Sequence, residues 1–148
     1  MLRTEPYALQ ATRSPSSGRH ILAHYDHDSI VVYQAYRPAT GNNAAQHGRF
    51  GGEFSLSRMS WIKPGFLWMM YRSGWGTKDG QQVVLAVRLR RAAFDTILAR
   101  AVLSSFAAGP SISEADWKHA LAETEAVAQW DPDHNPTGAR LVGHTAIE

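Results

Sequence analysis

The chain contains no cysteine among its 148 residues. Disulfides, thiol catalysis and cysteine-ligated zinc are therefore excluded. A long apolar run is also missing: in the most aromatic segment, residues 59–75, the uninterrupted apolar stretch is only Phe66–Tyr71. A membrane span needs about 20 apolar residues, so we expect no membrane association. The N-terminal residues hold no apolar core typical of a secretory signal, and we expect a cytoplasmic location.

The sequence also lacks any block of like charge, because 15 basic residues are interspersed with 13 acidic ones. Composition alone therefore indicates no nucleic-acid surface. Twelve of the basic residues are arginine, which suits bidentate contact with phosphate or carboxylate, although a GC-rich genome would produce the same excess. A hydrophobic content of 44% is typical of a globular protein. We predict a flexible N-terminal arm over residues 1–18 and a single globular domain over residues 19–148.

The pattern of apolar residues predicts both strands and helices. Runs of β-branched and aromatic residues predict strands at Ile30–Tyr36, Gln81–Leu89, Ala126–Trp130 and Leu141–Ile147. Periodicity and capping signals predict helices at residues 64–73, 91–104 and 113–123, and a short helix or loop at 40–47. The segment WDPDHNPTG, residues 130–138, is typical of a turn-rich loop. We therefore expect an α+β domain with two small packed sheets, mixed or antiparallel, and flanking helices.

Residues 59–75 contain three of the five tryptophans, and their central helix should be buried on most sides. The two edges of this segment combine aromatic rings with cations and hydroxyl groups. Taken singly, the polar residues are solvated helix ends; together they suit a nucleotide with stacked rings and paired phosphates. We expect these edges to face Gln34 across a cleft. The candidate binding residues are Tyr36, Ser60, Trp61, Lys63, Tyr71, Arg72, Ser73 and Trp75.

Three further polar residues could take part in chemistry. Gln34 lies in the middle of a predicted strand, where its amide either points to solvent or hydrogen-bonds a planar ligand. Asp131 and Asp133 are either turn residues or a general base and an electrostatic stabiliser. The sequence holds no Gly-x-Ser-x-Gly motif and no phosphate-binding or dinucleotide fingerprint. Serine hydrolase, Rossmann and kinase-like functions are therefore disfavoured.

Histidine and aspartate cluster near the first predicted strand, at His20, His24, Asp26, His27 and Asp28. Two histidines on one strand face could hold a metal. No recognised ligand spacing follows downstream, and we expect a surface cluster with no metal.

Three segments resemble the domain-of-unknown-function family 4291 (DUF4291). They are AHYDHDSIVVYQAYRP, FSLSRMSWIKPGFLWMMYRSGWGTKDGQQVVLAVRLRRAAFDTILARA and AQWDPDHN, and the resemblance spans about residues 20–147. The order of elements also looks like that of ADP-ribosyltransferases, which implies NAD as cofactor. In that layout Gln34 stands where an Arg or His is usual, Ser60 lies on the serine strand, and Gln129 or Asp131 lies near the acidic position.

The resemblance implies an NAD-dependent transferase acting on a nucleic acid, nucleotide or protein acceptor. Its catalytic residues would be Gln34 and Asp131, the latter stabilising an oxocarbenium-like transition state. The alternative is a non-catalytic nucleotide- or RNA-binding module on the same scaffold, and an unrelated hydrolase or small-molecule enzyme is a third reading. We expect a nucleotide ligand, with RNA or DNA as a further partner; the oligomeric state is left open.

Overall fold

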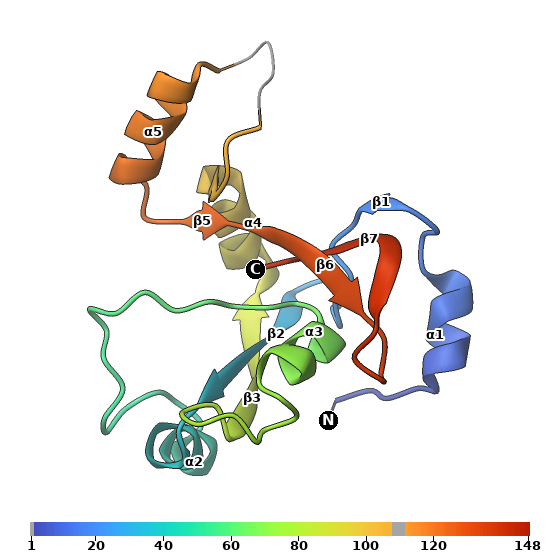
Figure 1. The fold of residues 1–148 in the computed structure, drawn as a ribbon. Coiled ribbons are helices and arrows are strands. Elements are labelled where there is room, and N and C mark those ends of the chain that lie inside the picture. Colours follow the sequence, from blue (N-terminus) through green and yellow to red (C-terminus); the bar gives the residue numbers. More distant parts are fainter. Residues whose placement is uncertain (1, 108–111) are drawn as a thin grey trace.

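The computed structural model describes residues 2–107 and 112–148, which form three small sheets flanked by helices (Figure 1). This arrangement confirms the predicted α+β class but contains three sheets instead of two. The helices are α1 (Tyr7–Arg13), α2 (Pro38–His47), α3 (Phe66–Arg72), α4 (Arg91–Arg100) and α5 (Glu114–Glu123). The strands are β1 (Gly18–Arg19), β2 (Ser29–Tyr36), β3 (Val83–Arg90), β4 (Val102–Leu103), β5 (Val127–Ala128), β6 (Trp130–His134) and β7 (Arg140–Ile147).

The antiparallel pair β2–β3 is the centre of the fold, in register from Ser29 opposite Arg90 to Tyr36 opposite Val83. Both strands form where β-branched and aromatic residues predicted them. Both faces of β2 are covered, since Val32 packs with Phe94 of α4 and Val31 packs with Met69 of α3. This double coverage makes β2 the most deeply buried element that the structure describes.

The second sheet has the order β1–β7–β6, with β7 antiparallel to β6. The predicted turn-rich loop over residues 130–138 is wrong, because its first half is strand β6. The true turn begins at Asn135, whose side-chain oxygen accepts hydrogen bonds from the backbone N–H groups of Thr137 and Ala139. Pro132 is tolerated because β6 pairs only with β7 and the ladder carries an irregularity at this point.

The N-terminal segment has more regular structure than the sequence indicated. Helix α1 lies inside the predicted arm, and Gly18–Arg19 pair in parallel with β7. None of the residues of α1 is buried. The predicted flexibility of residues 1–18 stays a prediction.

The C-terminal half contains two helices that the sequence predicted, α4 and α5. Helix α4 is shorter than the predicted 91–104, because the chain leaves it at Ala101 to form β4, which pairs in parallel with β5. Helix α5 begins as predicted after Ser113, whose hydroxyl oxygen accepts the backbone N–H of Asp116 at 3.1 Å. Figure 1 shows α5 projecting away from the β2–β3 and β1–β7–β6 sheets. It is attached to β4 by a 2.8 Å hydrogen bond from the Trp117 indole to the Leu103 carbonyl.

Helix α3 departs from its prediction in both length and burial. It spans only seven residues, and only Trp68 and Met69 are buried, whereas Phe66 and Tyr71 are nearly half exposed. The expectation of a helix buried on most sides is therefore wrong, because so short a helix covers β2 with one face and leaves the other in solvent. The residues before it form no strand, apart from a two-hydrogen-bond bridge between Lys63 and Tyr33.

Candidate functional site

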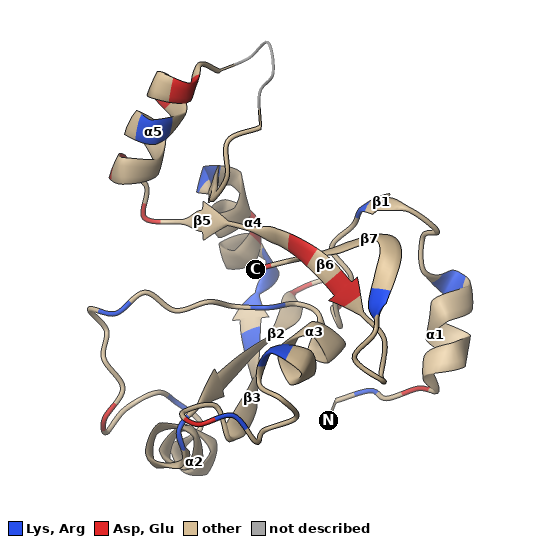
Figure 2. Cartoon of the chain, viewed as in Figure 1, with Lys and Arg blue, Asp and Glu red and all other residues tan. Residues whose placement is uncertain are grey.

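Buried polar atoms without a hydrogen-bond partner concentrate where α3 meets β6 and β7. In the described ranges they belong to Trp68, Asp131, His134 and Thr145, with two more on His24 and Tyr36, whereas the buried Lys63 ammonium is ion-paired with Glu148. Most buried polar groups in proteins are paired, and a cluster of exceptions marks a place where chemistry or binding occurs. Figure 2 shows the acidic residues of β6 beside this junction. We take the junction, named here the charged centre (Lys63, Trp68, Asp131, His134 and Glu148), as the candidate site.

Lys63 is the lysine of the charged centre, and only 1% of its surface is exposed. Its ammonium contacts the Glu148 carboxylate and lies 4.8 Å from the centroid of the Trp68 ring, a cation–π arrangement. Burial lowers the pKa of Lys63 to about 7, the negative charge of Asp131 opposes this shift, and the positive charge of Arg72 adds to it. The Glu148 contact acts in the same sense as Asp131. A buried amine of this kind can exchange a proton near neutral pH.

His134 forms the aromatic part of the charged centre. Its ring centroid lies 3.6 Å from that of Tyr71 and 5.3 Å from that of Trp68, with planes inclined by 13° and 10°. The residue is buried, and neither ring nitrogen has a partner in the described part of the chain. The sequence interpretation missed His134 because it placed this residue in a loop. The alternation of Trp130, Pro132 and His134 with two aspartates was the strand signal that could have revealed it.

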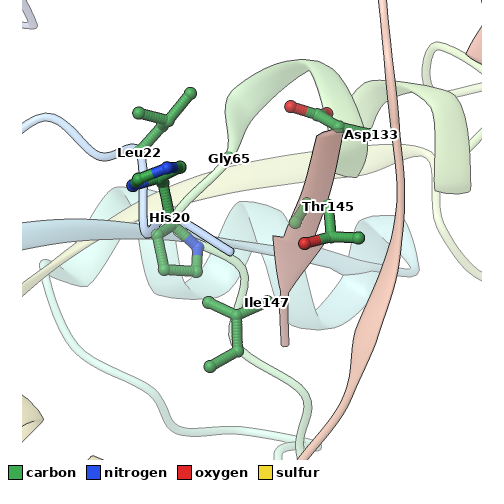
Figure 3. Close-up of a pocket in the computed structure, with 8 residues that line it drawn as sticks. His20, Leu22, Gly65, Asp133, Thr145 and Ile147 are labelled. Carbon is green, nitrogen blue, oxygen red and sulfur yellow. The ribbon is translucent and has the colours of Figure 1, made fainter. Parts of the chain in front are cut away.

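The two aspartates of β6 occupy different environments. Oδ1 of Asp131 accepts a 2.9 Å hydrogen bond from the Gln129 amide, whereas its Oδ2 is buried and has no partner among the residues that the structure describes. Asp133 lines a small cavity of about 20 Å³ together with His20, Pro64 and Thr145 (Figure 3). Such a volume holds about one water molecule. Neither aspartate is a fully exposed turn residue, and the charge of Asp131 is close enough to Lys63 to affect its pKa.

Gln34, whose amide was expected to bind a ligand, makes its side-chain hydrogen bond to the backbone and to no side chain of the charged centre. It is buried on β2, and its amide donates to the Trp61 carbonyl oxygen at 3.4 Å. Gln34 lines neither of the two best-formed cavities in the described residues. The indole of Trp61 is about one-third exposed. The Gln34 amide thus connects β2 to the segment before α3. This contact is structural.

Tyr36 and Ser60 form a separate group at the end of β2. The Tyr36 ring packs edge-on against Phe50 and Phe54 at 5.5 and 5.9 Å. Burial raises the pKa of Tyr36, and the neighbouring Ser60 side chain and the charge of Arg58 oppose this shift. The structure therefore does not bring this pair to the charged centre.

The residues at the end of α3 and just after it divide into one structural and three exposed side chains. Ser73 is fully buried; its hydroxyl donates to the Met70 carbonyl and accepts the Gly76 N–H, so it closes the helix. Tyr71, Arg72 and Trp75 remain exposed at this end. Trp75 has a φ of +55°, which is strained for a residue other than glycine by about 1 kcal/mol. An exposed indole held in this conformation is a feature that favours ligand stacking.

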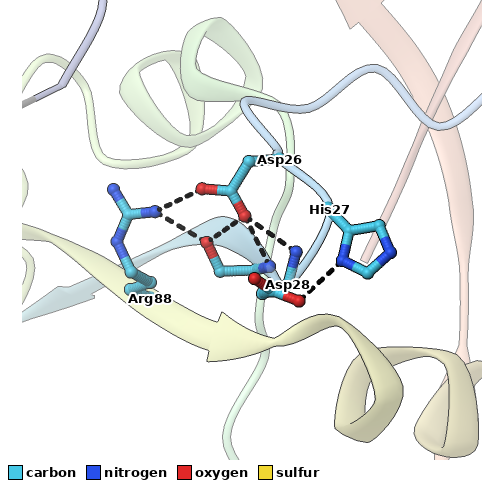
Figure 4. Close-up of polar contacts among 5 residues, drawn as sticks. Asp26, His27, Asp28 and Arg88 are labelled. Atoms are coloured by element: carbon cyan, nitrogen blue, oxygen red, sulfur yellow. Dashed lines mark hydrogen bonds and ion pairs between the residues drawn. The ribbon is translucent and has the colours of Figure 1, made fainter.

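The histidine–aspartate cluster before β2 lies on the surface, as predicted (Figure 4). Oδ1 of Asp26 accepts the backbone N–H groups of Asp28 and Ser29 and the Ser29 hydroxyl, and Arg88 of β3 contacts Asp26 and Ser29. These contacts, with the Ser29 hydrogen bonds first among them, lower the pKa of Asp26. Within residues 2–107 and 112–148, no three His, Asp or Glu side chains are grouped to hold a metal ion.

Fold and site together define a small α+β domain with a buried, incompletely paired charged centre. None of its helices, in the part that the structure describes, is both long and apolar enough to cross a membrane. The model of the family described as "Domain of unknown function (DUF4291)" matches residues 20–148, and the chain belongs to this family. No curated protein and no solved structure matches the chain. Membership of this family is therefore established, whereas the resemblance to ADP-ribosyltransferases stays a prediction.

Proposed function

We propose that this protein is an NAD-dependent enzyme resembling ADP-ribosyltransferases, acting on a nucleic acid, nucleotide or protein acceptor. The observation that carries the proposal is the Asp131 carboxylate, one oxygen of which is buried and accepts no hydrogen bond from the described residues. A carboxylate left partly unsatisfied is available to stabilise positive charge that develops in a transition state. Asp131 also accepts a hydrogen bond from Gln129, which orients it.

The residues around Asp131 fit an aromatic, anionic dinucleotide. NAD, when bound, would supply the ADP-ribosyl group, and its positively charged nicotinamide ring would leave as neutral nicotinamide. Trp75 is an exposed aromatic residue that could stack on a planar base, Tyr71 is partly exposed with one ring face stacked on His134, and Arg72 is an exposed cation for phosphate. Lys63, with its pKa near 7, can hold or release a proton beside Asp131. Ser73 and Gln34 support the scaffold and make no contact with a ligand in this proposal.

A non-catalytic nucleotide- or RNA-binding module on the same scaffold is the second candidate. One observation favours it: the position expected to carry a catalytic Arg or His holds Gln34, whose amide is already bonded to the Trp61 carbonyl. The same exposed aromatic residues would then bind a nucleotide without breaking any bond.

Incubation with NAD, followed by measurement of released nicotinamide, distinguishes the two candidates. We expect release in the presence of an RNA, DNA or protein acceptor, and a loss of about 100-fold or more in Asp131→Asn. Asp28→Asn is the matched control, since that carboxylate lies on the surface, bonded only to His27. Circular dichroism establishes that each variant is folded.

Two results would count against catalysis. NAD binding without nicotinamide release, with every acceptor tried, would support the binding module. Release that is unchanged in Asp131→Asn would remove Asp131 from the mechanism and with it the main support for the proposal.

A further inference from the structure

A second, unrelated cavity lies at the end of α2, well apart from β6 and β7 (Figure 1). It has a volume of about 220 Å³ and is lined by Asn43, His47, Arg49, Gly51 and Gly52. The volume of the cavity is about seven times the volume that one water molecule occupies in liquid water. The cavity can therefore admit a small anion but not a whole dinucleotide. It contains none of the residues of the charged centre.

The groups that line this cavity are mostly donors. The guanidinium of Arg49 has donors only and makes no ion pair among the described residues. The Nδ1–H of His47 is donated to the Asn43 carbonyl oxygen at 2.9 Å, so this hydrogen is not available to a ligand. No carboxylate lines the cavity in the part of the chain that the structure describes. A lining of this kind selects against cations and for anions.

The backbone adds two further donors. Gly51 and Gly52 follow one another along the wall of the cavity, and their N–H groups donate to no acceptor within residues 2–107 and 112–148. Gly52 has a φ of +60°, and a Cβ there would lie 3.3 Å from Cγ of Asn43. Glycine is therefore favoured where the loop passes over the Asn43 amide.

The loop that carries these donors is fixed in place. Phe50 and Phe54 stack with ring centroids 4.4 Å apart, and both pack against Tyr36 at the end of β2. An ion pair of 2.7 Å between Arg37 and Glu53 joins the loop to the start of α2. A loop anchored at both ends loses little conformational entropy when a ligand binds, so its donors are already organised for binding.

We propose that this cavity is a binding site for a phosphate or pyrophosphate group, held by Arg49 and the N–H groups of Gly51 and Gly52. The C-terminus of α2 opposes an anion with about half an elementary charge, which the full positive charge of Arg49 outweighs. The shared chemistry is the phosphate oxygen, whether it belongs to a free anion or to a nucleoside diphosphate. This proposal does not depend on the NAD reaction.

Titration followed by amide NMR tests the site, with inorganic pyrophosphate and ADP as the two probes. We expect the signals of Gly51 and Gly52 to shift with a dissociation constant of about 1 mM or lower. ADP that binds no more tightly than pyrophosphate would assign the site to the phosphate group alone, whereas tighter ADP binding would assign it to a nucleoside diphosphate. Both results support a phosphate site.

Two arginine variants provide the decisive comparison. Arg49→Gln is expected to weaken pyrophosphate binding about tenfold, because one charge-assisted contact is lost. Arg58→Gln is the matched control, since Arg58 is exposed in the same connection but does not line the cavity. An equal loss in both variants, or no shift of Gly51 and Gly52 with either probe, would overturn the proposal. Loss of nicotinamide release in Asp131→Asn tests the other site separately.

Discussion

The β2–β3 pair and the charged centre lie next to one another but are built on opposite principles. The core around Val32 and Val31 buries apolar side chains on both faces of β2 and leaves few polar atoms to satisfy. The charged centre buries an amine, an imidazole and carboxylates, several of them without hydrogen-bond partners in the described part of the chain. The apolar core around β2 stabilises the fold. The charged centre contributes less to the free energy of unfolding than an apolar core of the same size would.

This difference indicates what each region is for. Burial of apolar groups favours folding whatever the function, because it depends only on area removed from water. A buried lysine beside an unsatisfied aspartate lowers stability, and natural proteins retain such groups chiefly where they bind or catalyse. Four changes, from the largest expected effect to the smallest, test whether the two regions differ in this way.

Removal of the buried charge at Lys63 should change how stability depends on pH. The pKa of Lys63 lies near 7 in the folded chain, below its ordinary value of 10.5, so between these values the unfolded chain binds more protons. The free energy of unfolding should therefore rise by on the order of 4 kcal/mol as pH increases from about 7 to about 10. Lys63→Met should abolish this rise in urea denaturation curves.

The control for that comparison is Lys118→Met, because the Lys118 side chain is 66% exposed and pairs only with Glu114. It should retain the pH dependence of the parent chain. If Lys63→Met kept the same slope, Lys63 would not titrate in this range and the charged centre would differ less from the core than we infer.

Truncation in the apolar core should cost stability without touching the site. Val32 is fully buried, and Val32→Ala removes two methyl groups, which should lower the free energy of unfolding by about 2 kcal/mol. Val142→Ala, at a position 96% exposed on β7, should be neutral. Denaturant curves provide the measurement; nicotinamide release per folded molecule should be the same in both variants, and a selective loss in Val32→Ala would contradict a purely structural core.

The opposite sign is expected for an apolar replacement of His134. Phenylalanine keeps the stack on Tyr71 and Trp68 but removes two buried nitrogens that lack partners in the described residues. His134→Phe should therefore raise the free energy of unfolding by about 1 kcal/mol. His119→Phe, on the exposed side of α5, should change it little. A stability loss in His134→Phe would show that the imidazole is satisfied, for example by water.

Relief of backbone strain at Trp75 should have the smallest effect on stability. Trp75→Gly removes a left-handed conformation that costs about 1 kcal/mol, while the added freedom of the unfolded chain offsets about half of this gain. The melting temperature should rise slightly, and NAD affinity should fall because the exposed indole is lost. Trp75→Phe keeps both the strain and an aromatic ring, so NAD titration of this variant should resemble that of the parent chain.

Local sequence signals predicted the elements whose residues agree with their tertiary surroundings. The β2 and β3 strands, the Ser113 cap of α5 and the final strand β7 all follow from β-branched runs or a capping residue. Strand β6 was missed because Asp-Pro-Asp favours a turn when considered alone. Only pairing with β7 compensates for a proline in a strand, and that partner is separated from it by the turn at Asn135.

The candidate site was predicted only in part. Lys63 and Asp131 were both among the candidate residues, but as members of different groups, and His134 and Glu148 were not considered. Gln34 was expected to face the aromatic edges across a cleft, yet its amide is bonded to the backbone of one of those edges at Trp61. Spacing along a chain does not indicate which buried polar groups meet, because the contacts join β6, β7 and the segment before α3.

The sequence by itself determined the class of fold, the absence of cysteine chemistry and the family, since these depend on composition and on local patterns within single segments. Only the tertiary structure decided that Lys63 is buried, that it lies between Glu148, Asp131 and Trp68, and that Gln34 is part of the scaffold. The physical reason is that the ionisation and availability of a side chain depend on desolvation and on neighbouring charges. Both are properties of the packed molecule and not of the chain.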